Sequence, residues 1–318
     1  MDEQENSINR PLISVVICTY NNATSLALTL EQLSAQQTTN KQNFEIILIN
    51  NNSSDHTSEI CKSFVEQTPI SARYFLESRQ GLSHARNTGV QNSSGIYILF
   101  TDDDADLPIN WLESYQKIIE EHQPDCLYSK INVIWDKPSP WWFLPEYNPC
   151  FVHLDYGPEL LHVSDYHKEF YGKNFSVKKE LIERMGGFDP ALGRNGGKLI
   201  AGEETLLYRR LIEMNKIVIY FPNAAVGHRL KEREYTEENI RKQFIDSAYS
   251  IHHISRLVAR KRILGRPFRA IIDNLQMVAS SLLGYIIAAL QSNKSYKLYH
   301  KLCLLRSLTY IKLWVSAK

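Results

Sequence analysis

Three consecutive aspartates, Asp102, Asp103 and Asp104, are the residues of this chain that are best suited to do chemistry. They follow an apolar run, residues 96–100, which predicts a buried strand that ends where the carboxylates begin. Ligands of open α/β sheets bind at the carboxyl ends of strands. Adjacent like charges repel unless a cation lies among them, and oxygen ligands at this density suit Mg²⁺ or Mn²⁺ bridging a diphosphate. A solvated acidic turn is the alternative for this stretch alone.

A second acidic pair, Glu203 and Glu204, precedes a leucine-rich stretch that predicts a helix. Adjacent residues of a helix point about 100° apart, so the two carboxylates face different surroundings. Two acids in a first turn also complement the helix dipole, which is worth a few tenths of a kcal/mol. The chemical role and this structural role are compatible.

The composition of the 318-residue chain is that of a folded globular protein, with 43% hydrophobic and 22% charged residues. This length predicts one large domain and an appendage. The five cysteines are scattered without a CxxC pair, which argues against a disulfide framework or a zinc site and favours a reducing compartment. The polar, acidic N-terminus predicts no signal peptide.

The overall charge of +1 hides an asymmetry, because residues 231–318 contain 16 Lys and Arg against 6 Asp and Glu. The rest of the chain is therefore acidic. An acidic body with a basic tail is not a nucleic-acid-binding pattern, and it indicates a C-terminal segment that faces something anionic.

Apolar runs alternate with helical patterns through the first hundred residues. This alternation predicts βαβ units and a parallel sheet. Neither a GxGxxG nor a GxxxxGK[ST] motif is present, so a Rossmann or P-loop site is not indicated. The expected strands are 12–20, 44–49, 72–76 and 96–100, and the expected helices are 23–36, 55–67 and 81–91.

Four stretches in this part of the chain resemble the successive motifs of family 2 glycosyltransferases. They are Ser14–Asn21, Asn51–Asp55, Arg79–Asn87 and Asp102–Asp104. Later stretches fit the same family: Phe170–Val177 resembles its G-x-N strand, Gly186–Asp189 its GGFD, Gly202–Thr205 its ED motif, and Val226–His228 its terminal histidine. The resemblance covers about residues 12–229.

The resemblance implies a GT-A fold, an αβα sandwich with a mostly parallel central sheet, and the pattern beyond residue 230 adds a C-terminal helical extension. We expect a flexible N-terminus over 1–10 and a nucleotide-sugar-binding half over 11–130. An acceptor-binding and catalytic half should follow over 131–230. A basic helical region, with possible membrane association, should occupy 231–318.

A sugar transferase must neutralise a leaving diphosphate and deprotonate an acceptor hydroxyl. By the resemblance, Asp104, Asp102 and His228 would bind the metal, Mg²⁺ or Mn²⁺. Glu204 would be the catalytic base and Glu203 its supporting neighbour. Without the family, a single histidine after a strand is more often a packing or surface residue.

The donor site implied by the resemblance includes an asparagine, Asn50, where many relatives carry an aspartate that reads the base. An amide both donates and accepts, so the identity of the nucleotide (UDP, GDP or dTDP) stays open. Arg86 and Asn87 would support the nucleotide site, or tie their helix to the acidic strand end. The predicted donor-binding residues are Thr19, Tyr20, Asn21, Asn50, Asn52, Arg79, Gly81, Arg86, Asn87, Asp102, Asp103, Arg194 and Lys198.

Arg194 and Lys198 belong to a glycine-rich stretch, 193–198, next to the expected base. It could close over the diphosphate and stabilise the departing charge, or be a plain surface loop. The aromatic segment 134–170 is expected to hold the acceptor, since aromatic faces stack on sugar rings. These rings could equally form the core of an irregular subdomain. The predicted acceptor-binding residues are Trp141, Trp142 and Asn174.

Residues 277–290 of the tail form a 14-residue apolar stretch that contains no charge and is shorter than the ~20 residues that span a bilayer. Basic residues precede it, so a helix lying at an anionic membrane surface fits better than a spanning one. The alternative is a helical hairpin packed on the catalytic domain or on a dimer partner.

The sequence therefore predicts an inverting, metal-dependent glycosyltransferase of the hexosyltransferase type. It would act on a nucleoside-diphosphate sugar and a saccharide or lipid-linked acceptor, in cell-surface polysaccharide or glycolipid synthesis. We expect it in the cytoplasm, with possible peripheral attachment to the inner face of the membrane. The alternatives are a non-catalytic nucleotide-binding scaffold of the same fold and a metal-dependent nucleotidyltransferase.

Overall fold

The structure is a computed structural model that describes residues 10–38, 43–195, 199–259, 261–263 and 265–316. Contacts divide the chain into two compact units. The first consists of residues 1–134, 152–190 and 203–229, and the second of residues 135–151, 191–202 and 230–318. The units group residues by contact, whereas the four ranges expected above group them by role, and those ranges stay predictions.

The first unit contains a mixed sheet whose strands, in spatial order, are β3-β2-β1-β4-β8-β6-β9-β5, with β7 also paired to β9. The central strands are buried on both faces, as the apolar runs predict for a covered sheet. The strands are β1 Ile13–Thr19, β2 Phe44–Asn50, β3 Ala72–Leu76, β4 Tyr97–Asp102, β5 Ala105–Asp106, β6 Cys126–Ile134, β7 Leu161–His162, β8 Asn174–Lys178 and β9 Val218–Arg229.

The first four strands are parallel to one another, and β6 and β9 share their direction. Only β8 and the short β5 and β7 run the opposite way. In the β4–β8 pair, Thr101 lies opposite Asn174, so the residue before β8 meets the acidic end of β4. The prediction of an α/β, GT-A-like sandwich with a mostly parallel sheet is confirmed.

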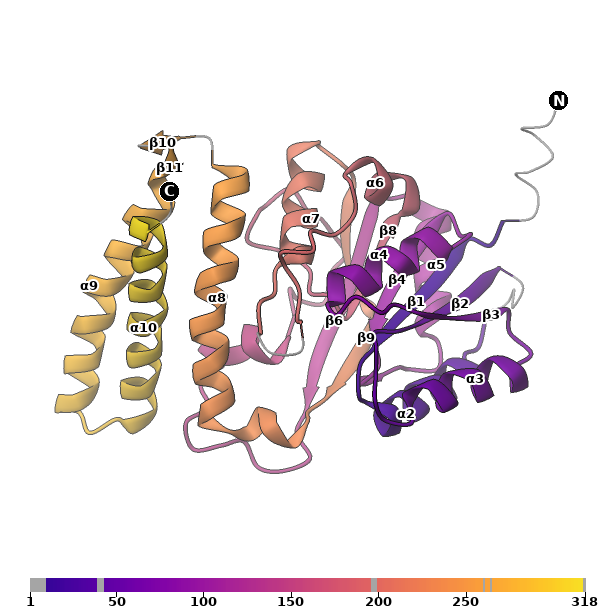
Figure 1. Cartoon of the computed structure of the whole chain (residues 1–318), viewed down its shortest axis with the longest axis horizontal. Coiled ribbons are helices and arrows are strands. Elements are labelled where there is room, and N and C mark those ends of the chain that lie inside the picture. The colour runs from indigo at the N-terminus through magenta and orange to yellow at the C-terminus, as the bar shows by residue number, and fades with distance from the viewer. Residues whose placement is uncertain (1–9, 39–42, 196–198, 260, 264, 317–318) are drawn as a thin grey trace. The chain divides into compact units, whose positions relative to one another are not determined.

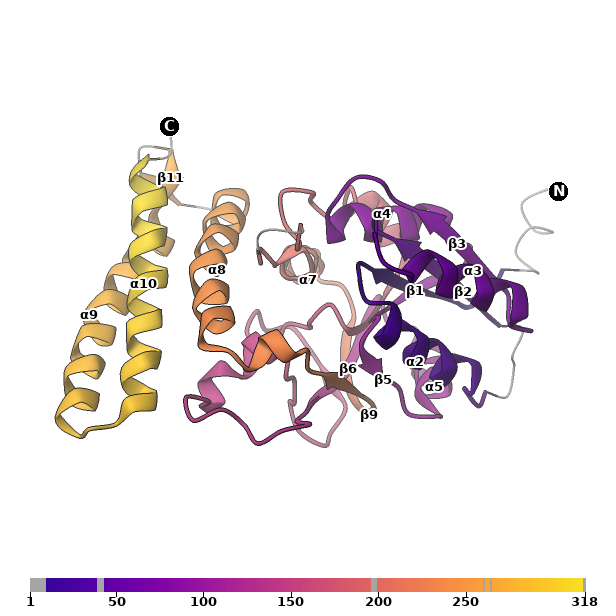
Figure 2. The same ribbon diagram turned by 60° about the horizontal axis from the view of Figure 1, so that its bottom comes forward.

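Helices cover both faces of this sheet. Leu26, Leu30 and Leu33 recur at helical spacing and are the buried side of α2, as their spacing predicts. Figures 1 and 2 show α2 and α3 on one side of β1, β2 and β3, and α4 on the other side. The helices of this unit are α2 Ala23–Ser34, α3 Thr57–Gln67, α4 Leu82–Asn92, α5 Trp111–His122, α6 Lys179–Arg184 and α7 Glu203–Glu213.

The second unit is mainly helical. Its long helices are α8 Glu237–Val258, α9 Phe268–Leu290 and α10 Lys294–Ser316, and α10 packs against both α8 and α9. The 3₁₀ helices η1 Pro145–Phe151 and η2 Glu232–Tyr235 and the short hairpin β10 Arg262–Ile263 with β11 Arg266–Pro267 complete it. The expected helical extension is present.

The apolar stretch 277–290 is the second part of a longer helix than the sequence suggests. Helix α9 has 23 residues, and among the described residues it is the one helix long and apolar enough to cross a membrane by length and composition. Only 17% of the most apolar 18-residue stretch of this helix is buried. The expectation that this stretch is too short to span a bilayer therefore does not hold for the whole helix.

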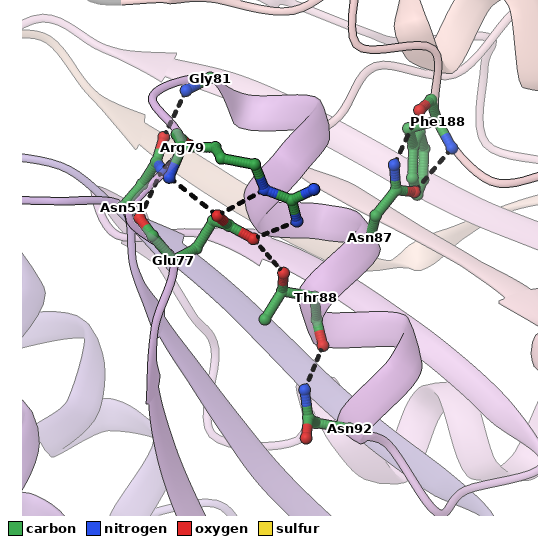
Figure 3. A network of polar contacts seen from close by, with 8 residues as sticks. All are labelled: Asn51, Glu77, Arg79, Gly81, Asn87, Thr88, Asn92 and Phe188. Carbon is green, nitrogen blue, oxygen red and sulfur yellow. Dashed lines mark hydrogen bonds and ion pairs between the residues drawn. The ribbon is translucent and has the colours of Figure 1, made fainter.

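A polar network joins the carboxyl ends of β2 and β3 to the start of α4 (Figure 3). The Asn51 side chain accepts a hydrogen bond from the backbone N–H of Gly81 at 2.8 Å and donates to the backbone carbonyl of Arg79 at 2.7 Å. Glu77 accepts from the backbone and guanidinium of Arg79 and from the Thr88 hydroxyl. Gly81 has a φ of 142°, which favours glycine at this turn.

These hydrogen bonds hold the pKa of Glu77 at about 2, below its ordinary 4.5. The Arg79 side chain is the largest cause, burial opposes it, and Thr88 adds to it. Because the folded pKa is the lower one, the folded protein binds fewer protons than the unfolded chain between these pH values. The contribution of Glu77 to stability is complete above pH 4.5 and is lost as the pH falls toward 2.

We predict that Glu77→Gln lowers the free energy of unfolding by about 1–3 kcal/mol at pH 7, because the charged acceptor of the network is lost. The difference from the unsubstituted protein should shrink in urea titrations as the pH is lowered from 5 to 3. Glu66→Gln, at an exposed position of α3, is the control and should change little. An undiminished difference at pH 3 would contradict the charge-based explanation.

Candidate functional site

The acidic end of β4 is held by a buried lysine. The Lys173 side chain is 1% exposed, and its ammonium donates to Oδ1 of Asp104 and lies 3.2 Å from Oδ2 of Asp102. Burial by itself would lower the pKa of Lys173, but the charges of Asp104 and Asp102 raise it above its ordinary value. The lysine is therefore charged at neutral pH and compensates the two carboxylates.

Asp103 has a different partner, since its Oδ1 accepts a hydrogen bond of 2.6 Å from the amide of Asn22. Its backbone carbonyl accepts a hydrogen bond from the Thr29 hydroxyl of α2. These contacts fasten the turn after β4 to the turn after β1 and to α2. Asp103 is thus a tether of the acidic turn in this structure.

Arg86 and Glu203 form a buried ion pair across 117 residues of sequence, with Nη1 and Oε1 2.5 Å apart. Both side chains are almost fully buried. The guanidinium also donates to the carbonyl of Gly172 at 3.0 Å. Its centre lies within 6 Å of three phenylalanine rings, a favourable cation–π arrangement, and these rings are Phe100, Phe175 and Phe188.

Gly172 and Gly187 are required by the side chains that pack on them. A Cβ at Gly172 would overlap the Arg86 guanidinium, and one at Gly187 would lie 2.5 Å from Oδ1 of Asn87. Asn87 in turn bonds both the N–H and the carbonyl of Phe188, each at 2.8 Å. The predicted supporting role of Arg86 and Asn87 thus has a structural basis in this unit.

Glu204 lies beside Glu203 at the start of α7 and has no ion-pair partner of its own among the described residues. The Oε2 atoms of both side chains are buried without a hydrogen-bond partner in the described part of the chain. Burial and the neighbouring charge of Glu204 raise the pKa of Glu203, and Arg86 opposes this shift. A third carboxyl, that of Glu169, has its pKa raised by burial and by Glu204.

His228 is buried on β9, opposite Ala105 of β5, and the next residue, Arg229, donates its N–H to the carbonyl of Asp104. The strand of His228 therefore runs beside the acidic turn. Among the described residues, however, no group of three or more His, Cys, Asp or Glu side chains is arranged to hold a metal ion. The predicted metal-ligand set of Asp104, Asp102 and His228 therefore stays a prediction.

The two carboxylates nevertheless fit a divalent cation chemically. Mg²⁺ is usually bound by one or two carboxylates together with substrate phosphates and water. Asp102 and Asp104 supply this number of ligands at one strand end, with the Lys173 ammonium between them. A cation there would depend on phosphate oxygens to complete its coordination.

The turns after β1 and β2 are bonded to each other. The backbone N–H of Asn21 donates to the Ser53 hydroxyl at 2.9 Å, and the Asn21 side chain accepts from the N–H of Ser54. Asn21 and Asn52 have φ values of 48° and 61°, conformations that asparagine tolerates better than most residues. Thr19 is buried with a hydroxyl that lacks a partner among the described residues, and Tyr20 is 42% exposed.

Asn50, which was expected to read the base, uses its side chain inside the protein. Its amide donates to Ser58 at 2.8 Å and to Tyr74 at 3.3 Å, and its Oδ1 accepts from the N–H of Ser53. The side chain is fully buried. Asn50 therefore shapes the turn after β2, and Arg79, which is 62% exposed, is the more accessible polar side chain of this edge.

Asn174 is a core residue. Its Oδ1 accepts from Trp111 and Tyr115, and its amide donates to the carbonyls of Lys130 and Ala224, all at 2.9 Å. Both polar groups are thus used to fasten β8 to its surroundings. That Asn174 contacts the acceptor stays a prediction.

The remaining predicted residues lie in the second unit. Trp142 is 2% exposed and packs against Tyr147 and Phe151, as expected of a core ring, whereas Trp141 is 58% exposed. Arg194 is exposed, and Lys198 lies outside the described residues. Trp141 and Arg194 remain predictions as ligand contacts.

Sequence reasoning missed Lys173, Glu169 and Asn51 as contributors to this region. Lys173 stands inside the G-x-N motif, and a lysine between aromatic and apolar neighbours at a strand start was an available signal. Asn51 lies within a motif that was recognised, but its neighbours Asn50 and Asn52 were chosen instead. No pattern in the sequence connected Glu169 with Glu204.

The sequence and the fold of this chain are similar to those of known glycosyltransferases. The profile of glycosyl transferase family 2 matches residues 14–186, more than half of the chain. A glucosyl-dolichyl phosphate glucuronosyltransferase of Haloferax volcanii is 27% identical over 230 residues, which cover 69% of this chain and 70% of that protein. Glycosyltransferase GlyA of Streptococcus pneumoniae is 36% identical over 113 residues, which make up 36% of this chain and only 16% of GlyA.

Among solved structures, a mannosyltransferase from Pyrobaculum calidifontis in complex with GDP-mannose and Mn²⁺ is similar over 98% of this chain and 89% of that chain. The TM-score is 0.65 at 18% sequence identity, so the similarity shows a shared fold. The fold continues beyond the part that the family profile covers.

We predict that Arg86→Met destabilises the protein by about 3–5 kcal/mol, because it leaves the Glu203 carboxylate buried without its counter-ion. Arg79→Met is the matched control, since Arg79 also pairs with a glutamate but is largely exposed, and it should destabilise the protein less than Arg86→Met does. Chemical denaturation at pH 7 measures both changes. Adding Glu203→Gln to Arg86→Met should recover part of the loss, and full additivity would contradict the pairing.

Proposed function

Because the chain belongs to glycosyl transferase family 2, we propose that it transfers a sugar from a nucleoside-diphosphate sugar to an acceptor hydroxyl with inversion at the anomeric carbon. The donor is proposed to be a hexose derivative. The observation that carries this proposal is the contrast between the adjacent glutamates. Oε1 of Glu203 is bound to Arg86, whereas Glu204 has no ion-pair partner among the described residues, and each of the two side chains has a buried Oε2 without a hydrogen-bond partner there.

In the proposed reaction, Glu204 accepts the proton of the acceptor hydroxyl while the hydroxyl oxygen attacks the anomeric carbon and the nucleoside diphosphate leaves. General-base catalysis of this kind contributes about 10²–10⁴ in rate. Arg86 fixes Glu203, and Glu203 precedes Glu204 on α7, so the ion pair sets the direction in which Glu204 points.

The proposed metal site consists of Asp102 and Asp104, with His228 on the strand beside them. A divalent cation bound there would supply positive charge to the leaving diphosphate. Mn²⁺ accompanies GDP-mannose in the Pyrobaculum structure, and this supports a divalent cation without identifying it. A screen of nucleotide sugars with Mg²⁺ or Mn²⁺ would identify the donor and the metal. UDP, GDP and dTDP sugars are the first set to test.

A saccharide or lipid-linked saccharide is the proposed acceptor, in polysaccharide or glycolipid synthesis. The Haloferax relative is a glucosyl-dolichyl phosphate glucuronosyltransferase, and this supports the lipid-linked class. Exposed Trp141 offers an aromatic face of the kind that stacks on sugar rings. The non-catalytic scaffold is less well supported, because the acidic residues of the predicted site are all present.

We predict that Glu204→Gln lowers the rate of sugar transfer by about 10²–10⁴ without loss of donor binding. The donor is first identified from the nucleotide-sugar panel by thermal stabilisation, and transfer is then measured with that donor. Glu213→Gln, at the exposed end of the same helix, is the control. Unchanged turnover in Glu204→Gln would contradict the assignment of the base.

We also propose that the second unit contacts an anionic membrane surface from the cytoplasmic side. Helix α9 exposes large apolar side chains, among them Leu275, Leu282, Leu283, Ile286 and Leu290, and exposed Lys261, Arg262 and Arg269 lie before and at its start. An amphipathic helix with cations beside its apolar face suits the interface of anionic lipids.

We predict that the triple substitution Leu282→Ser, Leu283→Ser and Ile286→Ser abolishes sedimentation of the protein with vesicles that contain anionic phosphatidylserine. Binding of the unsubstituted protein should weaken as salt is raised, since the basic residues contribute through screened charge. Ile109→Ser, at an exposed apolar position of the first unit, is the control. Equal binding to neutral vesicles, or loss of self-association in place of vesicle binding, would contradict this proposal.

A further inference from the structure

Lys173 occupies a position that the register of the sheet determines. The antiparallel β4–β8 pair ends with Thr101 opposite Asn174, so Lys173, the residue before β8, comes next to the end of β4, where Asp102 lies. The side chain is 1% exposed, and its ammonium reaches Asp102 and Asp104 together. The lysine thus lies between the same two carboxylates that the proposed function assigns to a divalent cation.

The backbone on both sides of Lys173 is fixed. Before it, Gly172 is packed against the Arg86 guanidinium, which also bonds its carbonyl at 3.0 Å. After it, Asn174 makes hydrogen bonds to Trp111 and Tyr115 and to two backbone carbonyls. If another cation takes the place of the ammonium, only the side chain of Lys173 can therefore move, because the backbone on both sides is held.

The two carboxylates cannot serve both cations fully. An ammonium and a divalent ion between the same oxygens repel each other, so one must leave for the other to bind closely. A cation that binds without nucleotide would gain two carboxylate ligands and strand the Lys173 charge in a buried position. A cation that arrives with a diphosphate gains phosphate ligands, and the ammonium gains phosphate oxygens as new acceptors, because a lysine has three N–H donors.

We propose that Lys173 competes with the divalent cation for Asp102 and Asp104, so that the cation binds tightly only together with a nucleoside diphosphate. This inference rests on the proposed function. Lys173 is the residue that couples the two binding events: it holds the acidic strand end in the absence of ligand and moves onto the diphosphate when the cation takes the carboxylates. Because such coupling is reciprocal, the cation strengthens nucleotide binding by the same factor.

The test is a titration of nucleotide-free protein with Mn²⁺. The electron paramagnetic resonance signal of free Mn²⁺ is followed, and it gives the affinity of the protein for the ion. We expect Lys173→Met to bind Mn²⁺ at least tenfold more tightly than the unsubstituted protein, because the competing charge is gone. Lys178→Met is the matched control, since Lys178 lies at the far end of β8 and pairs with Asp125 at 3.1 Å, and its Mn²⁺ affinity should be unchanged. Equal or weaker Mn²⁺ binding by Lys173→Met would overturn the inference.

A second measurement uses the unsubstituted protein and stands even if Lys173→Met does not fold. Mn²⁺ affinity is compared with and without saturating UDP, GDP or dTDP, whichever binds. We expect the nucleotide to strengthen Mn²⁺ binding at least tenfold, and we expect this factor to be smaller in Lys173→Met. Tight Mn²⁺ binding without nucleotide would overturn the inference alone, whereas failure of all three nucleotides to bind with Mn²⁺ present would also contradict the proposed function.

Discussion

The rest of the site depends on the compensation of buried carboxylates by two buried cations. Asp104 and Glu203 are buried, so each would be costly without a counter-ion, and the partly exposed Asp102 lies beside Asp104 at the same strand end. Lys173 is the counter-ion of the aspartates, and Arg86 is the counter-ion of Glu203. Gly172 lies between these two cations, because its carbonyl accepts a hydrogen bond from Arg86 and the next residue is Lys173. The turn 172–173 therefore connects the acidic strand end with the start of α7.

This arrangement separates residues that hold charge from the residue proposed to use it. Arg86, Glu203 and Lys173 are paired and buried, and Asp103 is tied to Asn22. Glu204 is the acid next to this framework that has no ion-pair partner among the described residues, and its buried Oε2 has no hydrogen-bond partner there. A catalytic base needs a fixed orientation and an available carboxylate oxygen. The paired neighbour Glu203 would help to fix the orientation of Glu204 without occupying its oxygen. The contrast explains why two adjacent glutamates can have different roles.

The fold was predictable because its signals are local. Buried strands such as β2 consist of unbroken apolar residues, and α2 shows its core side at helical spacing, so the alternation of elements follows from the sequence. The internal contacts of the predicted ligand-binding side chains were not predictable in this way, since Asn50 and Asn174 make hydrogen bonds inside the protein. Their motif positions could be recognised, but the direction of a side chain depends on partners far away in the sequence.

The sequence by itself determined the order of the elements, the family and the acidic motifs, because apolar periodicity and motif spacing are properties of short stretches. Only the tertiary structure decided which charges pair. The Arg86–Glu203 contact spans 117 residues, and the contact of Lys173 with Asp104 follows from the antiparallel register of β4 and β8. Such pairs form only when distant strands and helices pack together. For this reason the sequence did not show that Lys173 is the counter-ion of the strand end.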